Sequence, residues 1–341
     1  MPGEIPFRRV DMVVLESLIC SLLLILSLVG NVLVIAVVFK KPRLSTTTSL
    51  FIAALATTDL INAVIPSPLF LASLITGKMP YSSIGCDISG FFMHFLTLAS
   101  VSTMGLIAIN RYFCVVQPHR YKIIFPARRS AIFLASLWAF IALVVVFPLI
   151  VGWASMEFSP LMATCSLHFN SLTSETGFTV FVMLCFVVSS FVIVALCYYF
   201  VSKSLRQHQN HLSNVLGRGL SVQEINLTKT FFVLVVSFIV LWLPTFVVIV
   251  LFRVVLGETL PRQLALSVPY ELLVNSAVNP WIYGAMNPSF RKKFISILRR
   301  SEASRVQPIA GDATHPPQNI SPNLQVKTIE LKLEINPTVD I

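Results

Sequence analysis

Seven long runs of apolar residues, each long enough to cross a lipid bilayer as a helix, constrain this chain more than any other feature. About 20 such residues span the roughly 30 Å of bilayer hydrocarbon, and a helix satisfies its own backbone hydrogen bonds within lipid. The sequence therefore predicts an all-α membrane protein, a seven-transmembrane helix bundle over residues 12–286. The runs lie at roughly 12–39, 48–75, 87–116, 130–152, 176–202, 228–256 and 263–286.

Composition and charge favour a membrane protein over a nucleic-acid binder. Hydrophobic residues make up 55% of the 341 and charged residues only 12%, far from a soluble domain. The net charge is +10, and 20 of the 25 Lys and Arg lie in one set of connections (40–47, 111–129, 203–229 and after 287). The positive-inside rule then predicts an extracellular N-terminus over 1–11 and a cytoplasmic C-terminus. The remaining five are Arg8, Arg9, Lys78, Arg253 and Arg262.

The residues after the last run are expected to leave the bundle. Segment 287–300 carries phenylalanines on one side and Lys and Arg on the other, which predicts an amphipathic helix that lies on membrane lipids. Segment 301–341 is rich in Ser, Thr, Pro and Asn and has no helical apolar period. Such a composition is typical of a disordered tail, here on the cytoplasmic side.

Two of the six cysteines are expected to face the oxidising side of the membrane. Cys86 lies at the outer end of the third run and Cys165 in the loop after the fourth, whereas the others lie in the runs or at a cytoplasmic end. A disulfide between Cys86 and Cys165 would tie that loop to the third helix. The alternative is a pair of free thiols in a compartment that oxidises them.

Short motifs occur in a fixed order, most of them in different runs. They are Gly30-Asn31, Leu55-Ala56-Thr57-Thr58-Asp59, Cys86 followed by Asn110-Arg111-Tyr112, Trp138, Phe238-x-x-x-Trp242-x-Pro244, and Asn279-Pro280-x-x-Tyr283 followed by Phe290. With these motifs the chain resembles a rhodopsin-like (class A) G-protein-coupled receptor over about residues 12–300. Each motif alone is weakly specific, whereas the ordered set is very specific.

The resemblance implies a receptor and not an enzyme. A small, neutral or lipophilic extracellular ligand would signal to heterotrimeric G proteins through outward movement of the sixth helix, at the plasma membrane and without a cofactor. Arrestin and receptor kinases are implied as further partners. Alternatives of the same fold are a peptide-activated or a constitutively active receptor. Alternatives of other classes are a retinal photoreceptor, which needs a lysine where this chain has Leu273, and a seven-span membrane hydrolase, which needs clustered histidines and acids.

Asp59 lies near the bilayer midplane, about eleven residues, or roughly 16 Å, into its run. An ionised carboxylate there needs a cation or several hydrogen-bond donors. The resemblance implies a sodium ion that acts as an allosteric modulator and favours the inactive state. The residues implied to hold it are Asp59, Ser100, Asn275, Ser276 and Asn279. The alternative is a neutral Asp59 that is hydrogen-bonded to the same amides.

An activation switch is expected between the third and sixth helices. Arg111 and Glu224 would form an ion pair that holds these helices together in the silent receptor, the alternative being two separately solvated charges. The family usually has an acid before this arginine, so Asn110 is expected to remove one restraint on Arg111. Pro244 predicts a hinge, so that pressure on Trp242 would move the cytoplasmic half of the helix outward. The resemblance adds Tyr112, Tyr198, Phe238, Pro280 and Tyr283 to the switch.

By correspondence with the family, the outer half of the bundle encloses a ligand pocket with an apolar and aromatic lining. The implied residues are Met93, His94, Thr97, Met183, Phe186, Trp242, Thr245, Phe246, Ile249, Tyr270 and Leu273. Met93 stands where amine receptors have an acid and Leu273 where opsins have a lysine, which disfavours both ligand classes. His94 is expected to be a structural histidine rather than a ligand contact or a proton sensor.

Some positions point to or away from a subgroup of the family. The Asn-Arg-Tyr motif and Met93 are similar to those of melatonin receptors, which usually lack the proline at Pro280. Pro148 and Ile249 stand where the pocket asparagines of those receptors would be. In the fifth run, Ser190 stands where relatives have a proline, so the sequence gives no support for the helix bulge that this proline creates.

Overall fold

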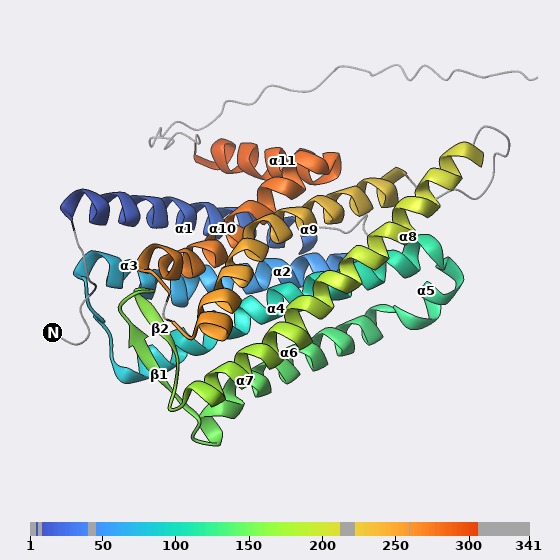
Figure 1. Ribbon diagram of the computed structural model, residues 1–341. Helices are drawn as coiled ribbons and strands as arrows, with labels where there is room; N and C mark the ends of the chain where they lie inside the picture. Colours follow the sequence, from blue (N-terminus) through green and yellow to red (C-terminus); the bar gives the residue numbers. More distant parts are fainter. Residues whose placement is uncertain (1–4, 6–8, 40–45, 212–221, 259, 306–341) are drawn as a thin grey trace, which may run out of the picture. The chain divides into compact units, whose positions relative to one another are not determined.

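Long helices make up almost all of the chain that the structure describes (Figure 1). The computed structural model describes residues 5, 9–39, 46–211, 222–258 and 260–305. The chain divides into a compact unit, Met1–Arg300, and a second unit, Ser301–Ile341. The elements are α1 (Val10–Phe39), α2 (Thr46–Val64), α3 (Pro66–Thr76), α4 (Ser83–Val116), α5 (Pro118–Ile124), α6 (Ala127–Ile150), β1 (Ala154–Ser159), β2 (Thr164–Phe169), α7 (Leu172–Val182), a π-helical segment (Met183–Val188), α8 (Ser189–His211), α9 (Val222–Ile249), a second π-helical segment (Val250–Leu256), α10 (Arg262–Met286) and α11 (Pro288–Arg305).

Six helical stretches among the described residues are long and apolar enough to cross a membrane. They are Val10–Phe39, Thr47–Thr76, Ser83–Val116, Ala127–Ile150, Leu172–Gln207 and Ile225–Leu256. The seventh long helix, α10, has 25 residues. It is less apolar because it carries buried polar side chains, among them Asn275, Ser276 and Asn279. The arrangement is the predicted seven-helix bundle.

The second stretch bends where the sequence suggests one continuous run over 48–75. α2 ends at Val64 and α3 begins at Pro66, with Ile65 between them. Proline has no backbone N–H and its ring clashes with the preceding turn, but it fits well at the first position of a new helix. The run is therefore two helices joined at a proline kink.

The fifth stretch contains a π-helical segment, Met183–Val188, between α7 and α8. The Ser189 N–H donates to the carbonyl of Leu184, five residues earlier, and the Ser189 hydroxyl donates to the Cys185 carbonyl at 2.5 Å. The hydroxyl thus satisfies a carbonyl that loses its usual backbone donor in the wider turn. This corrects the expectation at Ser190, because the helix widens without a proline.

α4 runs through the middle of the bundle and contacts α2, α5, α6, α8 and α9 (Figure 1). Its buried residues Leu96, Met104 and Ile107 belong to the largest hydrophobic cluster, which also includes residues of α9 and α10. Elsewhere α1 packs on α10, and a Cβ added to Gly30 would meet the ring of Pro280 at 2.7 Å. Only glycine fits at this crossing.

An antiparallel hairpin of β1 and β2 lies at one end of the bundle, which we call the hairpin end. Cys165 of β2 pairs with Phe158 in the ladder and forms a disulfide with Cys86 in the first turn of α4, which confirms the predicted bond. A Cβ added to Gly90 of α4 would meet the Met156 sulfur at 2.7 Å, so the hairpin packs tightly on this helix. The all-helical prediction missed these strands, because six-residue strands of mixed polarity give little periodic signal.

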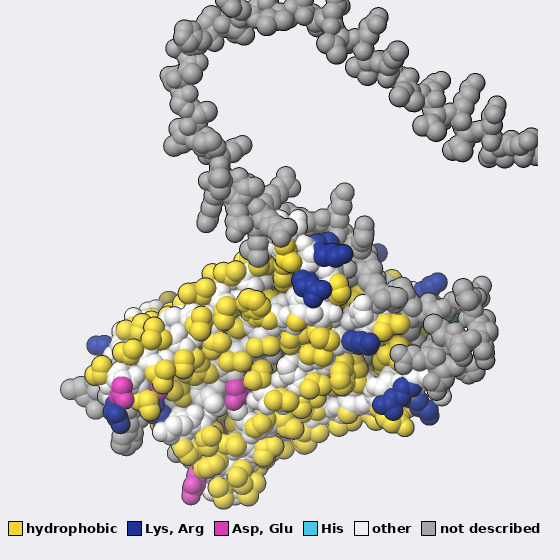
Figure 2. Space-filling model, turned by 90° about the horizontal axis from the view of Figure 1, so that it is seen from above, with side chains coloured by type: hydrophobic (Ala, Val, Ile, Leu, Met, Phe, Trp, Pro, Cys, Tyr) yellow, Lys and Arg dark blue, Asp and Glu magenta, His cyan; other side chains and the backbone are white. Residues whose placement is uncertain are grey.

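The opposite end, which we call the Arg111 end, holds the last turns of α4, the start of α2, and α5 (Figure 1). Figure 2 shows a wide hydrophobic belt, with Lys and Arg side chains gathering toward this end. Exposed basic residues of the helices there include Arg120 and Lys122 of α5, Arg128 and Arg129 of α6, Lys203 and Arg206 of α8, and Arg291 and Lys292 of α11. An apolar belt with basic side chains at one rim matches the profile of a helix bundle in a bilayer.

α11 occupies the segment for which the sequence predicts an amphipathic helix over 287–300, and it continues to Arg305. The ring of Phe290 is buried and stacks on Tyr283 of α10, with the ring centres 5.5 Å apart. One face of the helix therefore packs on the bundle, and the opposite face is basic. Residues 306–341 of the predicted tail lie outside the described residues.

Candidate functional site

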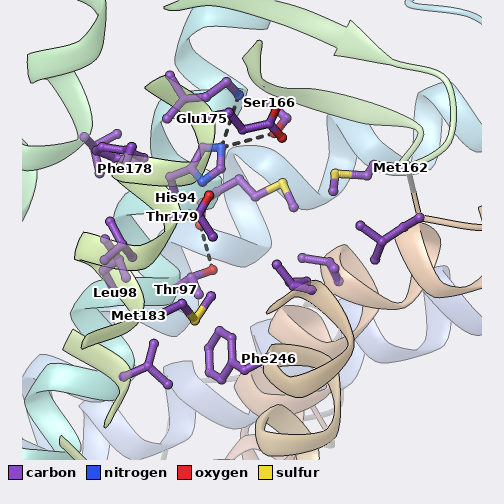
Figure 3. A pocket seen from close by; sticks show the side chains of 18 of the residues that line it. His94, Thr97, Leu98, Met162, Ser166, Glu175, Phe178, Thr179, Met183 and Phe246 are labelled. Atoms are coloured by element: carbon purple, nitrogen blue, oxygen red, sulfur yellow. Dashed lines mark hydrogen bonds between the residues drawn. The ribbon is translucent and has the colours of Figure 1, made fainter. Parts of the chain in front are cut away.

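A cavity of about 190 Å³ lies at the hairpin end between α4, β2, α7 and α9 (Figure 3). It is smaller than the roughly 300–1,000 Å³ of typical ligand sites, so it suits a compact ligand. Seven of the residues expected in the ligand pocket line it. They are Met93, His94 and Thr97 of α4, Met183 of the π-helical segment, and Trp242, Phe246 and Ile249 of α9.

The rest of the wall comes largely from the hairpin and α7, which the sequence did not place in the site. These residues are Met162, Ser166, Leu167, Phe169, Glu175, Phe178 and Thr179. Figure 3 shows Glu175, Ser166 and His94 together at one end of the cavity and Phe246 at the other. The lining is therefore amphipathic, where the sequence predicts an apolar one. The available signal was the position of Ser166 directly after Cys165, which the disulfide fixes over α4.

Phe186 and Thr245, two of the expected pocket residues, do not line the cavity. The ring of Phe186 stacks with Phe140 of α6, with the ring centres 5.9 Å apart. Phe186 lies within the π-helical segment, whose wider turn changes the direction of each side chain. The Thr245 hydroxyl donates to a carboxylate oxygen of Glu271 on α10, so it belongs to the contact between α9 and α10.

Tyr270 and Leu273 also lie outside the cavity, on the side of α10 that meets α1 and α3. The Tyr270 ring packs edge-on against Phe70, and its hydroxyl donates to the Glu16 carbonyl of α1 at 2.6 Å. Leu273 is fully buried in the same cluster as Cys20 and Phe70. These expectations are corrected, because the helix turns both residues toward their neighbours instead of the cavity.

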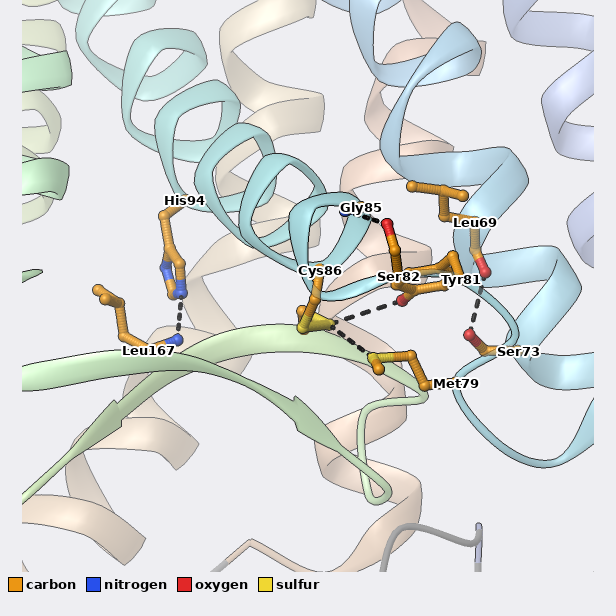
Figure 4. The surroundings of a disulfide bond; sticks show 10 residues. Leu69, Ser73, Met79, Tyr81, Ser82, Gly85, Cys86, His94 and Leu167 are labelled. Atoms are coloured by element: carbon orange, nitrogen blue, oxygen red, sulfur yellow. Dashed lines mark hydrogen bonds between the residues drawn. A yellow bond between two sulfur atoms is a disulfide. The ribbon is translucent and has the colours of Figure 1, made fainter.

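His94 joins α4 to β2. Its Nε2 accepts the backbone N–H of Leu167 at 3.3 Å and lies 3.3 Å from the Ser166 hydroxyl (Figures 3 and 4). Accepting a backbone N–H leaves Nε2 without a proton, so Nδ1 carries it in the neutral ring. This contact supports a structural role for His94, although the ring also forms part of the cavity wall.

The disulfide holds the hairpin over the cavity (Figure 4). The Tyr81 hydroxyl lies 3.7 Å from the Cys165 sulfur and donates toward it, since a disulfide sulfur carries no proton. Burial raises the pKa of the Tyr81 phenol above its ordinary value, which keeps this donor protonated. The Met79 sulfur lies 4.0 Å from the same sulfur. Both contacts come from the loop between α3 and α4, so this loop packs against the crosslink.

A second polar group of residues, which we call the Asp59 cluster, lies deep in the bundle between α1, α2 and α10. The Asn279 amide donates to the Asp59 carboxylate at 2.9 Å, and both side chains are buried. The Asn62 amide donates to the Ser276 hydroxyl at 3.1 Å, and the Asn31 amide donates to the Ser276 carbonyl at 2.9 Å. The structure thus brings Asp59, Ser276 and Asn279 together. Asn62 is an added member that no motif indicated.

The Asp59 cluster fits a small hard cation. It offers a carboxylate together with hydroxyl and amide oxygens, the ligands that such cations prefer. The Asn31 side-chain oxygen is buried and has no hydrogen-bond partner within the described part of the chain. Ser100 of α4 and Asn275 of α10 are buried as well. The expected residues are therefore of the right kind for sodium.

Arg111 is buried at the Arg111 end and makes several contacts. Its guanidinium donates twice to the side-chain oxygen of Asn110, at 2.7 and 3.2 Å, and once to the Thr48 hydroxyl of α2 at 2.9 Å. Its guanidinium carbon lies 5.3 Å from the centre of the Phe231 ring of α9. Asn110 therefore does not leave Arg111 unrestrained, because its neutral side-chain oxygen accepts two hydrogen bonds from the guanidinium; that it restrains Arg111 less than a carboxylate would stays a prediction.

The other members of the expected switch are spread around this end. Glu224 lies in the first turn of α9, and its side chain lies outside the described residues. The Tyr112 hydroxyl accepts from the Gln117 amide at 2.9 Å. Tyr198 and Tyr283 are buried, and neither hydroxyl has a hydrogen-bond partner within the described part of the chain. Buried hydroxyls without partners are uncommon, and each of them calls for a physical explanation.

Three aromatic rings of α9 stack along the helix, starting at the cavity. The ring centres of Phe246 and Trp242 are 5.4 Å apart, and those of Trp242 and Phe238 are 5.9 Å apart. Phe246 and Trp242 line the cavity, and all three rings are buried. Pro244 lies inside the helix among them. The stack leads from the cavity toward the Arg111 end.

Known proteins resemble this chain over most of its length. The family model described as 7 transmembrane receptor (rhodopsin family) matches residues 30–283. Melatonin receptor type 1A of Ovis aries is 27% identical over 278 residues, which cover 81% of this chain and 75% of that receptor. Melatonin receptor type 1C of Xenopus laevis is 28% identical over 280 residues, 81% of this chain and 65% of that receptor. Melatonin receptor type 1A-A of Danio rerio is 27% identical over 304 residues, 87% of this chain and 85% of that receptor.

Proposed function

Because the chain belongs to the rhodopsin family of seven-transmembrane receptors, we propose that it converts ligand binding in the hairpin-end cavity into nucleotide exchange on a heterotrimeric G protein at the Arg111 end. The observation that carries this proposal is the α9 stack, which begins in the cavity wall and leads toward Arg111. Members of this family are receptors and not enzymes. The chain is a multi-pass protein of the plasma membrane.

In this proposal the hairpin end faces the outside of the cell and the Arg111 end faces the cytoplasm. Two observations support the orientation. The Cys86–Cys165 disulfide belongs in an oxidising compartment, and basic side chains gather toward the Arg111 end. The N-terminus is then extracellular and the C-terminus cytoplasmic. Arrestin and receptor kinases would act on the same cytoplasmic side as the G protein.

Outward movement of α9 at the Arg111 end would open the G-protein site. Pro244 cannot donate a backbone hydrogen bond, so the helix bends more easily there. A ligand that presses on Trp242 would tilt the half of α9 that carries Phe231 away from Arg111. Tyr198 and Tyr283 are both buried, their hydroxyls have no hydrogen-bond partner among the described residues, and they would supply new hydrogen bonds in the open state.

The Asp59 cluster and Glu224 would stabilise the silent state. A sodium ion would supply positive charge to Asp59 and draw α2 and α10 together, and Glu224 would pair with Arg111 across the gap. Replacement of Glu224 with alanine is expected to raise basal nucleotide exchange. Unchanged basal exchange in a variant with normal surface expression would refute the Glu224 pair.

A second candidate for the ligand is a molecule of the kind that the melatonin receptors bind, which the similarity over 81% of the chain favours. The cavity argues against it at one position, because Ile249 lines the wall and offers no hydrogen bond. Pro148, at the other position where those receptors carry an asparagine, is buried in α6 and does not line the cavity. Direct binding of melatonin to the purified receptor separates the candidates. A short peptide would need more room than about 190 Å³.

The test of the proposed function is a panel of G-protein activation assays on the full-length receptor in cells, first without ligand and then with a library of small amphipathic molecules. At least one G protein should respond. Replacement of Arg111 with alanine should abolish the response without reducing surface expression. Failure of every G protein in a well-expressed receptor, and also in an Asp59→Asn variant, would contradict the proposal.

A further inference from the structure

A second cavity, of about 630 Å³, lies between α8 and α9 toward the Arg111 end, and we call it the α8–α9 groove. Lys203 and Arg206 of α8 line the end of the groove that is nearer to the Arg111 end, and apolar side chains line the rest. We propose that the groove holds an anionic phospholipid, whose phosphate pairs with these two residues and whose chain lies along the apolar part. The inference goes beyond the proposed function, and only the leaflet that supplies the lipid follows from the proposed orientation.

The basic end of the groove is suited to a phosphate. Lys203 and Arg206 are exposed, and neither forms an ion pair with another residue that the structure describes. The exposed Ser202 lines the groove beside them and offers a hydroxyl donor. Lys229 of α9 is exposed and precedes the groove residue Phe232 by about one turn, so positive charge comes from both helices. Basic pockets between membrane helices are where anionic lipid headgroups bind.

The apolar part of the groove is suited to a lipid chain. The rings of Tyr198 and Phe232 are 5.3 Å apart between their centres and join α8 to α9 within the groove. Tyr199, Phe232 and Val236 are exposed, so the groove opens on the outer surface of the bundle. From Phe232 to Ile239 the groove follows α9 for seven residues, or about 10 Å. This length lies within one leaflet, which is half of the roughly 30 Å of hydrocarbon.

Charge favours a lipid over a second copy of this chain. The exposed acids among the described residues are Asp11, Asp87, Glu157 and Glu258, and all of them lie in elements or loops at the hairpin end. Two copies in one membrane have the same orientation, so these acids cannot reach the basic end of a neighbour's groove. A phospholipid of the surrounding leaflet brings its negative charge to the level of the headgroups, next to the apolar belt (Figure 2).

The experiment measures lipid binding to the purified full-length receptor in a neutral detergent, from the rise in unfolding temperature with lipid concentration. Dioctanoyl phosphatidic acid should bind at least about tenfold more tightly than dioctanoyl phosphatidylcholine. Lys203→Gln combined with Arg206→Gln should remove this preference, whereas the matched control on α11, Arg291→Gln combined with Lys292→Gln, should keep it. Ala195→Trp fills the apolar part of the groove at an exposed position and should weaken phosphatidic acid binding although both basic residues remain.

Three results would overturn the inference: equal binding of the two lipids, an equal effect of inorganic phosphate, or unchanged phosphatidic acid binding in the Lys203 and Arg206 variant. A receptor dimer that Ala195→Trp dissociates, with lipid binding unaffected, would also overturn it, because a second copy then covers the groove. Nucleotide exchange on G proteins is measured in parallel. A receptor that binds phosphatidic acid through Lys203 and Arg206 but activates no G protein retains the inference and loses the signalling role. A receptor with basal exchange and no preference between the lipids retains the role and loses the inference.

Discussion

The hairpin-end cavity and the Asp59 cluster are both polar sites in an apolar bundle, but they are built in opposite ways. In the Asp59 cluster the side chains come from α1, α2 and α10 and bond one another. In the cavity the polar side chains come from β2, the first turn of α7 and α4, and they border an open space. The first site joins helices, whereas the second can exchange its contents.

Because of this difference in construction, the two sites should tolerate the loss of a polar side chain differently. In the Asp59 cluster, loss of one partner leaves another group buried without a hydrogen bond, which destabilises the bundle. In the cavity, loss of a polar group leaves space that water or a ligand fills. The cavity instead depends on the hairpin remaining over it, and a disulfide holds the hairpin there. Substitutions should therefore separate stability in one region from ligand recognition in the other.

The largest effect is expected from removing the disulfide with Cys86→Ser and Cys165→Ser together. The bond closes a sequence separation of 79 residues, for which chain-entropy estimates give about 4 kcal/mol of stability. The unfolding temperature should fall, and nucleotide exchange induced by any ligand from the library screen should be lost. Cys185→Ser, an exposed free cysteine, serves as the control. If ligand-induced exchange survives in the double variant, the hairpin does not depend on the crosslink.

The sequence predicted the Asp59 cluster better than the cavity, and the reason is physical. Asp59, Ser276 and Asn279 are polar residues in apolar helices. Such residues are rare there because burying them in lipid is unfavourable, so they stand out in a single sequence. Glu175 in the first turn of α7 and Ser166 in β2 lie between the apolar runs, where polar residues are ordinary. No periodicity shows which way they face, and only the folding of the hairpin and α7 around α4 brings them to the cavity.

The helix spans were predictable to within a few residues, but their irregularities were not. A run that is long and apolar enough to span the bilayer is expected to cross it as a helix, so the helix bundle could be predicted from the sequence. The π-helical segment Met183–Val188 has no hydrophobic signature in the sequence, so neither the widened turn nor the direction of Phe186 within it could be predicted.

The second prediction concerns Asn279→Leu in the Asp59 cluster. It removes the amide that donates to the buried Asp59 carboxylate, so a loss of about 3 kcal/mol is expected. Adding Asp59→Asn should recover part of this loss, because the unpaired group is then neutral. Chemical denaturation of the purified receptor measures both, with Thr57→Val on the exposed face of α2 as the control. Ligand binding in the cavity should change little. If Asn279→Leu lowers the free energy of unfolding equally with and without Asp59→Asn, the Asn279 amide does not stabilise the Asp59 carboxylate.

The third prediction concerns Asn110, which holds the Arg111 guanidinium through two hydrogen bonds. Asn110→Leu removes both, and hydrogen bonds to a charged group contribute about 2 kcal/mol each. Basal nucleotide exchange should rise severalfold, because Arg111 is less firmly held in the silent position. Asn110→Asp restores an acceptor and should keep basal exchange low. If the leucine variant signals like the wild type, Asn110 is not a restraint on Arg111.

The smallest effect is expected at the contact between Thr245 and Glu271, which joins α9 to α10 beside Pro244. Thr245→Val and Glu271→Leu each remove the hydrogen bond, so the double variant should lose less stability than the sum of the single variants. A coupling of about 1 kcal/mol is expected for a bond to a carboxylate. Glu271→Gln keeps an acceptor and should retain most of it.

The bond between Thr245 and Glu271 also tests whether ligand binding in the cavity is coupled to the interior of the bundle. Thr245 follows Pro244, the hinge of α9, and Trp242 of the same helix lines the cavity. Glu271 lies on α10, the helix that also carries residues of the Asp59 cluster. If the bond transmits ligand binding, Thr245→Val should leave the affinity for a ligand of the cavity unchanged and reduce the nucleotide exchange that this ligand induces. Equal loss of affinity and exchange would show that Thr245 only shapes the cavity. Additive stability losses, within about 0.5 kcal/mol, would show that the bond couples nothing.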